Sequence, residues 1–73
     1  MRRTFTAVIQ RDEDMFVALC PELDIASQGD TIEDARSNLR EAIELFLEYA
    51  APEEVRERMH EEQYISSVEV GGA

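Results

Sequence analysis

The fold of this protein is decided by residues 28–50, QGDTIEDARSNLREAIELFLEYA. Gly29 and Asp30 predict a turn, in which Gly29 suits a backbone position with positive φ. Thr31 then stands where a helix N-cap is expected, and Asp34 follows three residues later as in a capping box. Behind the cap, apolar side chains recur at helical spacing and form one stripe: Ala35, Leu39, Ala42, Ile43, Phe46 and Ala50. The stretch therefore predicts a long amphipathic helix.

Three further apolar residues near the end of this helix, Leu45, Leu47 and Tyr49, fall outside the stripe. They make the C-terminal end of the helix apolar most of the way round. Two interpretations stay open. Either the stripe widens to meet more of the core, or these side chains form a surface for a partner or a second copy.

The residues before the helix predict three short strands. Residues 3–10 alternate between apolar and polar side chains, and residues 11–14 form a polar cluster suited to a hairpin turn. Residues 15–20, MFVALC, are apolar on both sides, so we expect a central strand with both faces partly covered. Covering its second face, which includes Val17, needs another surface and is a first hint of self-association. Residues 25–28 predict a brief third strand after Pro21 ends the second.

The residues after the helix predict a second helix and one more strand. Pro52 opens residues 52–59 at a first-turn position, with acidic residues behind it. Residues 64–70, YISSVEV, alternate as a strand does, with Tyr64, Ser66, Val68 and Val70 on one face. We therefore expect an α+β fold of order β-β-β-α-(α)-β. Its small antiparallel sheet of three or four strands is packed on one face by the long helix, and residues 1–73 form a single domain.

The charge of the chain limits the partners it can bind. Its 73 residues include 17 Asp or Glu and 7 basic residues, all arginine, for a net charge of −10. Such a protein is repelled by phosphate backbones, so we expect no direct nucleic-acid binding. A basic protein is the natural partner, although the acidic residues are equally consistent with a role in solubility alone. No apolar run is long enough to span a membrane, and we expect a cytoplasmic protein.

The sequence shows no recognisable catalytic set. Cys20 and His60 stand alone, and we interpret Cys20 as a small buried residue and His60 as a solvated side chain. A cluster of acidic residues is weighed as a Mg²⁺ site, but its members lie in predicted turns and a solvated loop is the simpler interpretation: Asp12, Glu13, Asp14, Glu22 and Asp24. We expect no enzyme, cofactor or metal.

Three stretches together resemble one family. Residues 16–23, FVALCPEL, are similar to the aromatic-Val-Ala-x-x-Pro-Asp/Glu-Leu segment of the HicB-like antitoxins. Residues 27–31, SQGDT, resemble their Ser-x-Gly-Asp-Thr turn, and residues 33–47 resemble their Glu-Glu-Ala helix. The resemblance covers roughly residues 4–50 and implies a partial ribonuclease H fold without the catalytic carboxylates. It implies binding of a small basic HicA-type toxin that cleaves mRNA.

The resemblance also sets expectations for partners. Many family members add a C-terminal DNA-binding domain, which we do not find in residues 1–73. We expect the toxin to contact five acidic residues: Asp12, Asp14, Glu22, Asp24 and Asp30. We expect a homodimer or tetramer to use four apolar residues: Val17, Leu45, Leu47 and Tyr49. The alternative is a stand-alone homo-oligomeric HicB-like protein of unknown regulatory role without a toxin partner.

Overall fold

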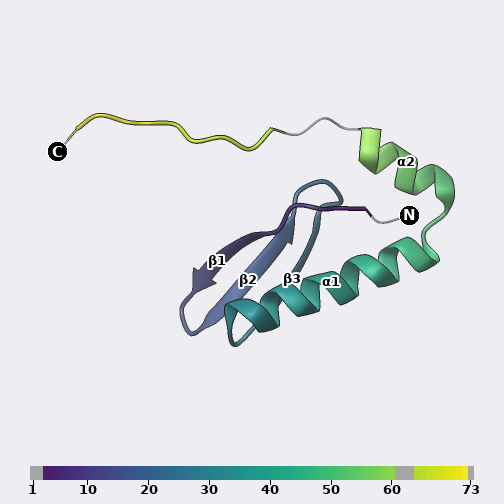
Figure 1. Ribbon diagram of the computed structural model, residues 1–73, viewed down its shortest axis with the longest axis horizontal. Helices are drawn as coiled ribbons and strands as arrows, with labels where there is room; N and C mark the ends of the chain where they lie inside the picture. The colour runs from purple at the N-terminus through teal and green to yellow at the C-terminus, as the bar shows by residue number, and fades with distance from the viewer. Residues whose placement is uncertain (1–2, 61–63, 73) are drawn as a thin grey trace.

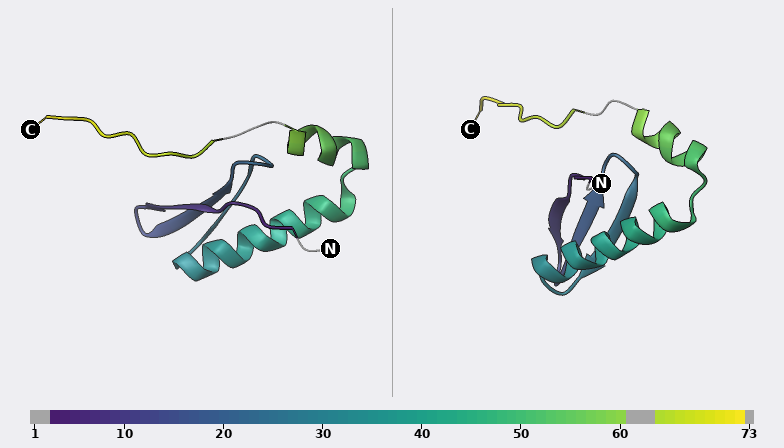
Figure 2. Two further views of the ribbon diagram at one scale, coloured as in Figure 1. Left: turned by 45° about the horizontal axis from the view of Figure 1, so that its top comes forward. Right: turned by 45° about the vertical axis from the view of Figure 1, so that its right-hand side comes forward.

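The computed structural model describes residues 3–60 and 64–72 of the chain. Their elements are β1 (Val8–Asp12), β2 (Met15–Cys20), β3 (Ile25–Gly29), α1 (Ile32–Tyr49) and α2 (Pro52–His60) (Figure 1). The three strands form an antiparallel sheet in the order β1-β2-β3. Figure 2 shows from two further sides that α1 lies along one face of this sheet. The predicted α+β class, the central position of the second strand and both helices are confirmed.

The core lies between β2 and the apolar stripe of α1. Ala18 and Cys20 of β2 are fully buried, and Leu23 of the following turn closes one end of the core. Ile9 is paired with Ala18, and Ile25 with Cys20, so all three strands contribute to the same face. The buried residues form one cluster: Ala18, Cys20, Leu23, Ala35, Leu39 and Ile43.

Both ends of α1 are set by local sequence. The Thr31 side chain accepts a hydrogen bond from the backbone N–H of Asp34 at 3.0 Å, so the predicted N-cap is confirmed. Asn38 then ties α1 to β3, because its Nδ2 donates to the carbonyl oxygen of Gln28 at 2.8 Å. The helix ends at Tyr49, because Pro52, three residues later, has no N–H with which to continue it. Pro52 is instead the first residue of α2.

Gly29 serves a purpose that differs from the one expected. Its φ is not positive, and it lies buried at the end of β3. A Cβ at this position would stand 2.5 Å from the backbone nitrogen of Ala35 and 2.7 Å from Asp34. The expectation of a left-handed turn residue is therefore wrong. Glycine is needed here because the first turn of α1 packs directly on the strand.

The first strand starts later than the sequence pattern indicates. Residues 3–10 were expected to form it, but β1 begins at Val8 and continues to Asp12, where Glu13 turns the chain with φ 56°. The register pairs Val8 with Leu19, which would place Thr6 opposite Pro21. Proline has no N–H for the ladder, so the strand does not extend toward the N-terminus. Thr6 instead donates its backbone N–H to Oε2 of Glu22 at 2.9 Å.

The expected last strand is wrong for the single chain. Residues 64–72 form neither helix nor strand, and in both views of Figure 2 this yellow segment stands apart from the sheet. Four of its apolar side chains are 62–88% exposed: Tyr64, Ile65, Val68 and Val70. Period-two alternation suits a segment to be a strand, but a strand forms only beside another strand, and residues 64–72 lie apart from the sheet.

Candidate protein-binding surfaces

Three of the five acidic residues predicted to bind a partner meet at one end of the sheet. Asp12 and Asp14 flank the β1–β2 turn, and Asp30 follows the last residue of β3. Pairing of Asp12 with Met15, and of Phe16 with Gly29, brings the two connections to the same end. We call this surface the acidic end, and it consists of six exposed carboxylates: Asp12, Glu13, Asp14, Asp30, Glu33 and Asp34.

Two arginines partly offset the charge of the acidic end. Arg36 lies 3.6 Å from Glu33 across one helical turn, and both side chains are mostly exposed. Arg11 Nε donates to the carbonyl oxygen of Glu13 at 3.1 Å and lies over the ring of Phe16. Exposed pairs of this kind contribute little attraction. With six carboxylates and two arginines, the acidic end keeps a net negative charge.

The other two predicted residues, Glu22 and Asp24, lie in the β2–β3 turn at the opposite end of the sheet. A strand of six residues, such as β2, separates the two ends by about 20 Å. The five residues therefore do not form one surface. Asp24 is exposed and has φ 54°, a conformation that asparagine also tolerates.

Glu22 is engaged inside the fold. Its Oε2 accepts the N–H of Thr6, and its Oε1 lies 3.6 Å from the Sγ of Cys20, which donates to it. Burial works to raise the pKa of Glu22, but hydrogen bonds from its own backbone N–H and from that of Thr6 outweigh burial, and the pKa lies below its ordinary value. The carboxylate thus joins the start of the chain to the β2–β3 turn, which the sequence pattern did not indicate.

Cys20 is a free thiol with no exposed surface, as expected of a small buried residue. Burial raises the pKa of the Cys20 thiol, and the neighbouring charge of Glu22 raises it further. Both effects keep the thiol protonated and unreactive. The side chain of His60 lies outside the part of the chain that the structure describes. Among residues 3–60 and 64–72, no three His, Cys, Asp or Glu side chains are grouped so as to hold a metal ion.

The four residues predicted for an oligomer interface lie on three separate surfaces. Val17 is half-buried on the outer face of the sheet, opposite Gln10 and Gln28. Leu45 and Tyr49 are 55% and 78% exposed on α1. Leu47 is half-buried and packs against the core, so the apolar stripe of α1 widens on that side.

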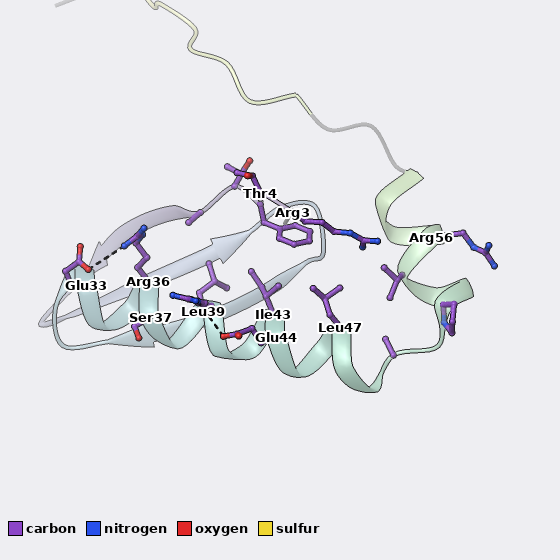
Figure 3. A pocket seen from close by; sticks show the side chains of 17 residues that line it. Arg3, Thr4, Glu33, Arg36, Ser37, Leu39, Ile43, Glu44, Leu47 and Arg56 are labelled. Atoms are coloured by element: carbon purple, nitrogen blue, oxygen red, sulfur yellow. Dashed lines mark ion pairs between the residues drawn. The ribbon is translucent and has the colours of Figure 1, made fainter. Parts of the chain in front are cut away.

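A groove that the sequence did not reveal runs between residues 3–7 and α1, with a volume of about 1270 Å³. In Figure 3, Leu39, Ile43 and Leu47 point from α1 into this groove. Four of the seven arginines of the chain also line it: Arg3, Arg36, Arg40 and Arg56. Only the helical spacing of Arg36 and Arg40 was visible in the sequence, because the fold alone brings Arg3 and Arg56 to the same place.

Comparison with known proteins places the chain among relatives of matching length. No family model matches it. UPF0150 protein ssl0738 of Synechocystis sp. is 41% identical over 64 residues, which cover 85% of this chain and 88% of the relative. The chain belongs to the UPF0150 family. A second UPF0150 protein of that organism, ssr1258, is 43% identical over 49 residues, or 64% of this chain and 71% of the relative.

The UPF0150 relationship concerns the fold as a whole. An aligned segment that covers 85% of a chain of 73 residues must include β2, β3 and α1, wherever it starts. In the part of the chain that the structure describes, neither α1 nor α2 has the length and hydropathy needed to cross a bilayer.

Proposed function

We propose that this UPF0150 protein is a HicB-like antitoxin module that binds and neutralises a small basic HicA-type toxin. The observation that carries the proposal is the acidic end, where two separate turns and the first turn of α1 present six exposed carboxylates together. The motifs of residues 16–23, 27–31 and 33–47 support it, because they resemble HicB-like antitoxins in both order and spacing.

The mechanism of neutralisation is occlusion. A ribonuclease that binds mRNA needs a basic surface for the phosphate backbone. The acidic end offers that surface a competing set of carboxylates on a rigid support, since the β1–β2 turn and the N-terminus of α1 are both fixed by the sheet. Charge complementarity of this kind speeds association and excludes RNA from the same surface.

The test is to mix the full chain with the purified toxin encoded by a neighbouring small basic gene. We expect a complex by gel filtration at low salt, loss of RNA cleavage on titration with the chain, and relief of growth arrest on co-expression. Affinity should fall steeply as salt rises, because the contacts are exposed charges. Absence of a complex at low salt together with unrelieved growth arrest would refute the proposal.

The position of the surface is tested with charge-only variants. Asp12→Asn combined with Asp14→Asn removes two carboxylates from the acidic end, and we expect at least tenfold weaker toxin binding. Asp24→Asn is the matched control, because it removes a carboxylate from the opposite end and asparagine tolerates its φ of 54°. If Asp24→Asn weakens binding as much as the double variant does, the toxin does not dock at the acidic end.

A second candidate function is a stand-alone homo-oligomer with a regulatory role and no toxin. The outer face of the sheet favours it, since Val17 and its neighbour Leu19 lie on the face that α1 does not cover, and Leu19 is 38% exposed. Sedimentation of the pure chain separates the two candidates. A chain that sediments as a monomer by itself and as a complex when toxin is added supports the antitoxin function. A stable oligomer that binds no basic protein supports the second candidate.

A further inference from the structure

Residues 64–70 have the pattern of a strand yet form none in the single chain. Their alternate side chains Tyr64, Val68 and Val70 would lie on one face of a strand, and each is more than four-fifths exposed. Clustered apolar side chains of this size are uncommon on the surface of a monomer and mark an interaction site. The segment is therefore suited to add to a sheet that it does not reach within its own chain.

The groove between residues 3–7 and α1 offers the complementary surface. Its floor is apolar, with Ile43 and Leu47 pointing into it in Figure 3. Its other wall leads into β1, which is an edge strand of the sheet. Edge strands carry backbone N–H and C=O groups with no ladder neighbour on the outer side, and these groups pair readily with an added strand.

The size of the groove fits a strand better than a small molecule. The α1 residues that line it run from Glu33 to Leu47, which is about 21 Å along the helix axis. Seven residues in a β-strand span about 23 Å, so residues 64–70 match this length. A volume of about 1270 Å³ exceeds that of a pocket for a small molecule, which is roughly 300–1,000 Å³.

The charges of the two surfaces are also complementary. The groove is lined by four arginines, Arg3, Arg36, Arg40 and Arg56, and by two glutamates, Glu33 and Glu44, which pair with Arg36 and Arg40. Residues 61–70, EEQYISSVEV, include three glutamates and no basic residue. Four arginines against two glutamates leave the lining with an excess of two positive charges in a protein whose net charge is −10, and this excess attracts an acidic strand.

We propose that residues 64–70 of a second copy of this chain dock in the groove as a strand beside β1, and that the exchange is reciprocal. The resulting dimer has twofold symmetry, with each copy giving one strand and receiving one. Glu33 and Arg36 border both the groove and the acidic end, but residues 64–70 belong only to the exchange, so variants in this segment test the dimer separately from toxin binding.

The position of α2 in the single chain is set by Arg58. Its guanidinium lies over the ring of Phe46, with 4.9 Å from Cζ to the ring centroid, and its Nη1 donates to the carbonyl oxygen of Leu23. Neither Phe46 nor Leu23 lines the groove. Arg58 therefore holds α2 against residues of the core, on the same side of α1 as the sheet, and the described residues 64–72 lie apart from both the sheet and the groove (Figures 1 and 3). Because the single chain leaves its groove empty, we assign the docked strand to a second copy.

The experiment is analytical ultracentrifugation of the full chain and two variants. The wild type is expected to sediment as a dimer, at twice the 8.3 kDa mass of the chain. Val68→Asp places a charge on the face that docks, and we expect at least tenfold weaker association. Ser67→Asp adds the same charge to the opposite face of the strand and is expected to leave the dimer intact. Circular dichroism verifies that both variants fold, since Val68 is 82% exposed in the single chain.

A fluorescence measurement identifies the occupant of the groove. The chain has no tryptophan, so Tyr64→Trp reports on the segment alone. Exchange predicts a blue-shifted emission that returns to the solvent-exposed value on dilution. A blue shift that persists in a monomer would show docking in the chain's own groove and overturn the proposal. A monomer with exposed emission, or a dimer unaffected by Val68→Asp, would overturn it as well.

A peptide of residues 61–70 labelled with fluorescein supplies the direct test. We expect it to bind the Val68→Asp protein, whose groove is empty, and to bind at least tenfold more weakly when Arg36→Glu and Arg40→Glu are added. Equal binding to both proteins would show that the peptide docks elsewhere and would overturn the assignment of the groove.

Discussion

Glu22 accepts the backbone N–H of Thr6 at 2.9 Å, although sixteen residues separate them in the chain. The contact engages the N–H of a residue that lies before the start of β1, and it holds residues 3–7 near the β2–β3 turn. Those residues form one wall of the groove along α1. A single carboxylate thus fixes the position of a segment that the sheet itself does not hold.

The first prediction concerns Glu22 and acid. A carboxyl group whose pKa falls on folding binds fewer protons in the folded state than in the unfolded one. The stability that Glu22 contributes is therefore complete above its ordinary pKa of 4.5 and is lost as the pH falls through the lower pKa of the folded state. Glu22→Gln should lower the free energy of unfolding at pH 7 by about 1 kcal/mol, measured by urea denaturation.

The control for this prediction is Glu48→Gln, which removes an exposed carboxylate from α1. We expect it to change stability at pH 7 by less than about 0.5 kcal/mol. Acid should destabilise the Glu22→Gln protein less than the wild type, because the group that titrates is gone. If the free energy of unfolding falls equally with pH in the wild type and in Glu22→Gln, the acid sensitivity does not arise from Glu22.

The second prediction concerns the attachment of α2. Arg58 contacts the Phe46 ring, the carbonyl oxygen of Leu23 and the carboxylate of Glu54, the last at 3.7 Å. Arg58→Ala should raise the rate of amide hydrogen exchange in α2 roughly tenfold, which corresponds to a loss of about 1.4 kcal/mol of local stability. Arg56→Ala removes an exposed arginine from the same helix and should leave these rates nearly unchanged. Equal effects of the two variants would exclude a specific role for Arg58.

The third prediction concerns the approach of α1 to β3. Gly29→Ala would place a methyl group 2.5 Å from the backbone nitrogen of Ala35, and neither the strand nor the capped helix turn can yield easily. We expect a loss of roughly 1–3 kcal/mol in the free energy of unfolding, measured by thermal denaturation. Gly71→Ala is the matched control, because a Cβ there meets nothing within 4 Å. A stable Gly29→Ala protein would show that α1 can shift on the sheet.

Local signals in the sequence predicted most of the elements. Thr31, the helical stripe that follows it, and Pro52 define α1 and α2, because caps, periodicity and proline act through neighbouring residues. The start of β1 was wrong because it depends on Pro21, which lies on the other strand. A local pattern cannot show which residue of a partner strand lacks an N–H.

The candidate surfaces were less predictable for a related reason. Asp12 and Asp30 meet only because two turns fall at the same end of the sheet, and Glu22 was assigned to a partner although it bonds Thr6. Residues 64–70 showed the limit most clearly. Their alternation predicted a strand, and that prediction is wrong for the single chain, because pairing depends on an edge within reach and the sequence does not show which edge that is.

The last prediction links the acidic end to stability. Six carboxylates gathered at one end of a small sheet repel each other, and only Arg11 and Arg36 lie among them. Asp14→Asn should therefore stabilise the free protein slightly, by at most about 0.5 kcal/mol at low salt, and added NaCl should erase the gain. Asp24→Asn, at the other end, should give a smaller gain, as measured by urea denaturation in both buffers. If the antitoxin proposal holds, the variant that folds more stably is also the one that binds toxin more weakly, because the repulsion within the free protein is what a basic partner relieves. Equal stability of the two variants at low salt would show that the carboxylates of the acidic end do not act on one another.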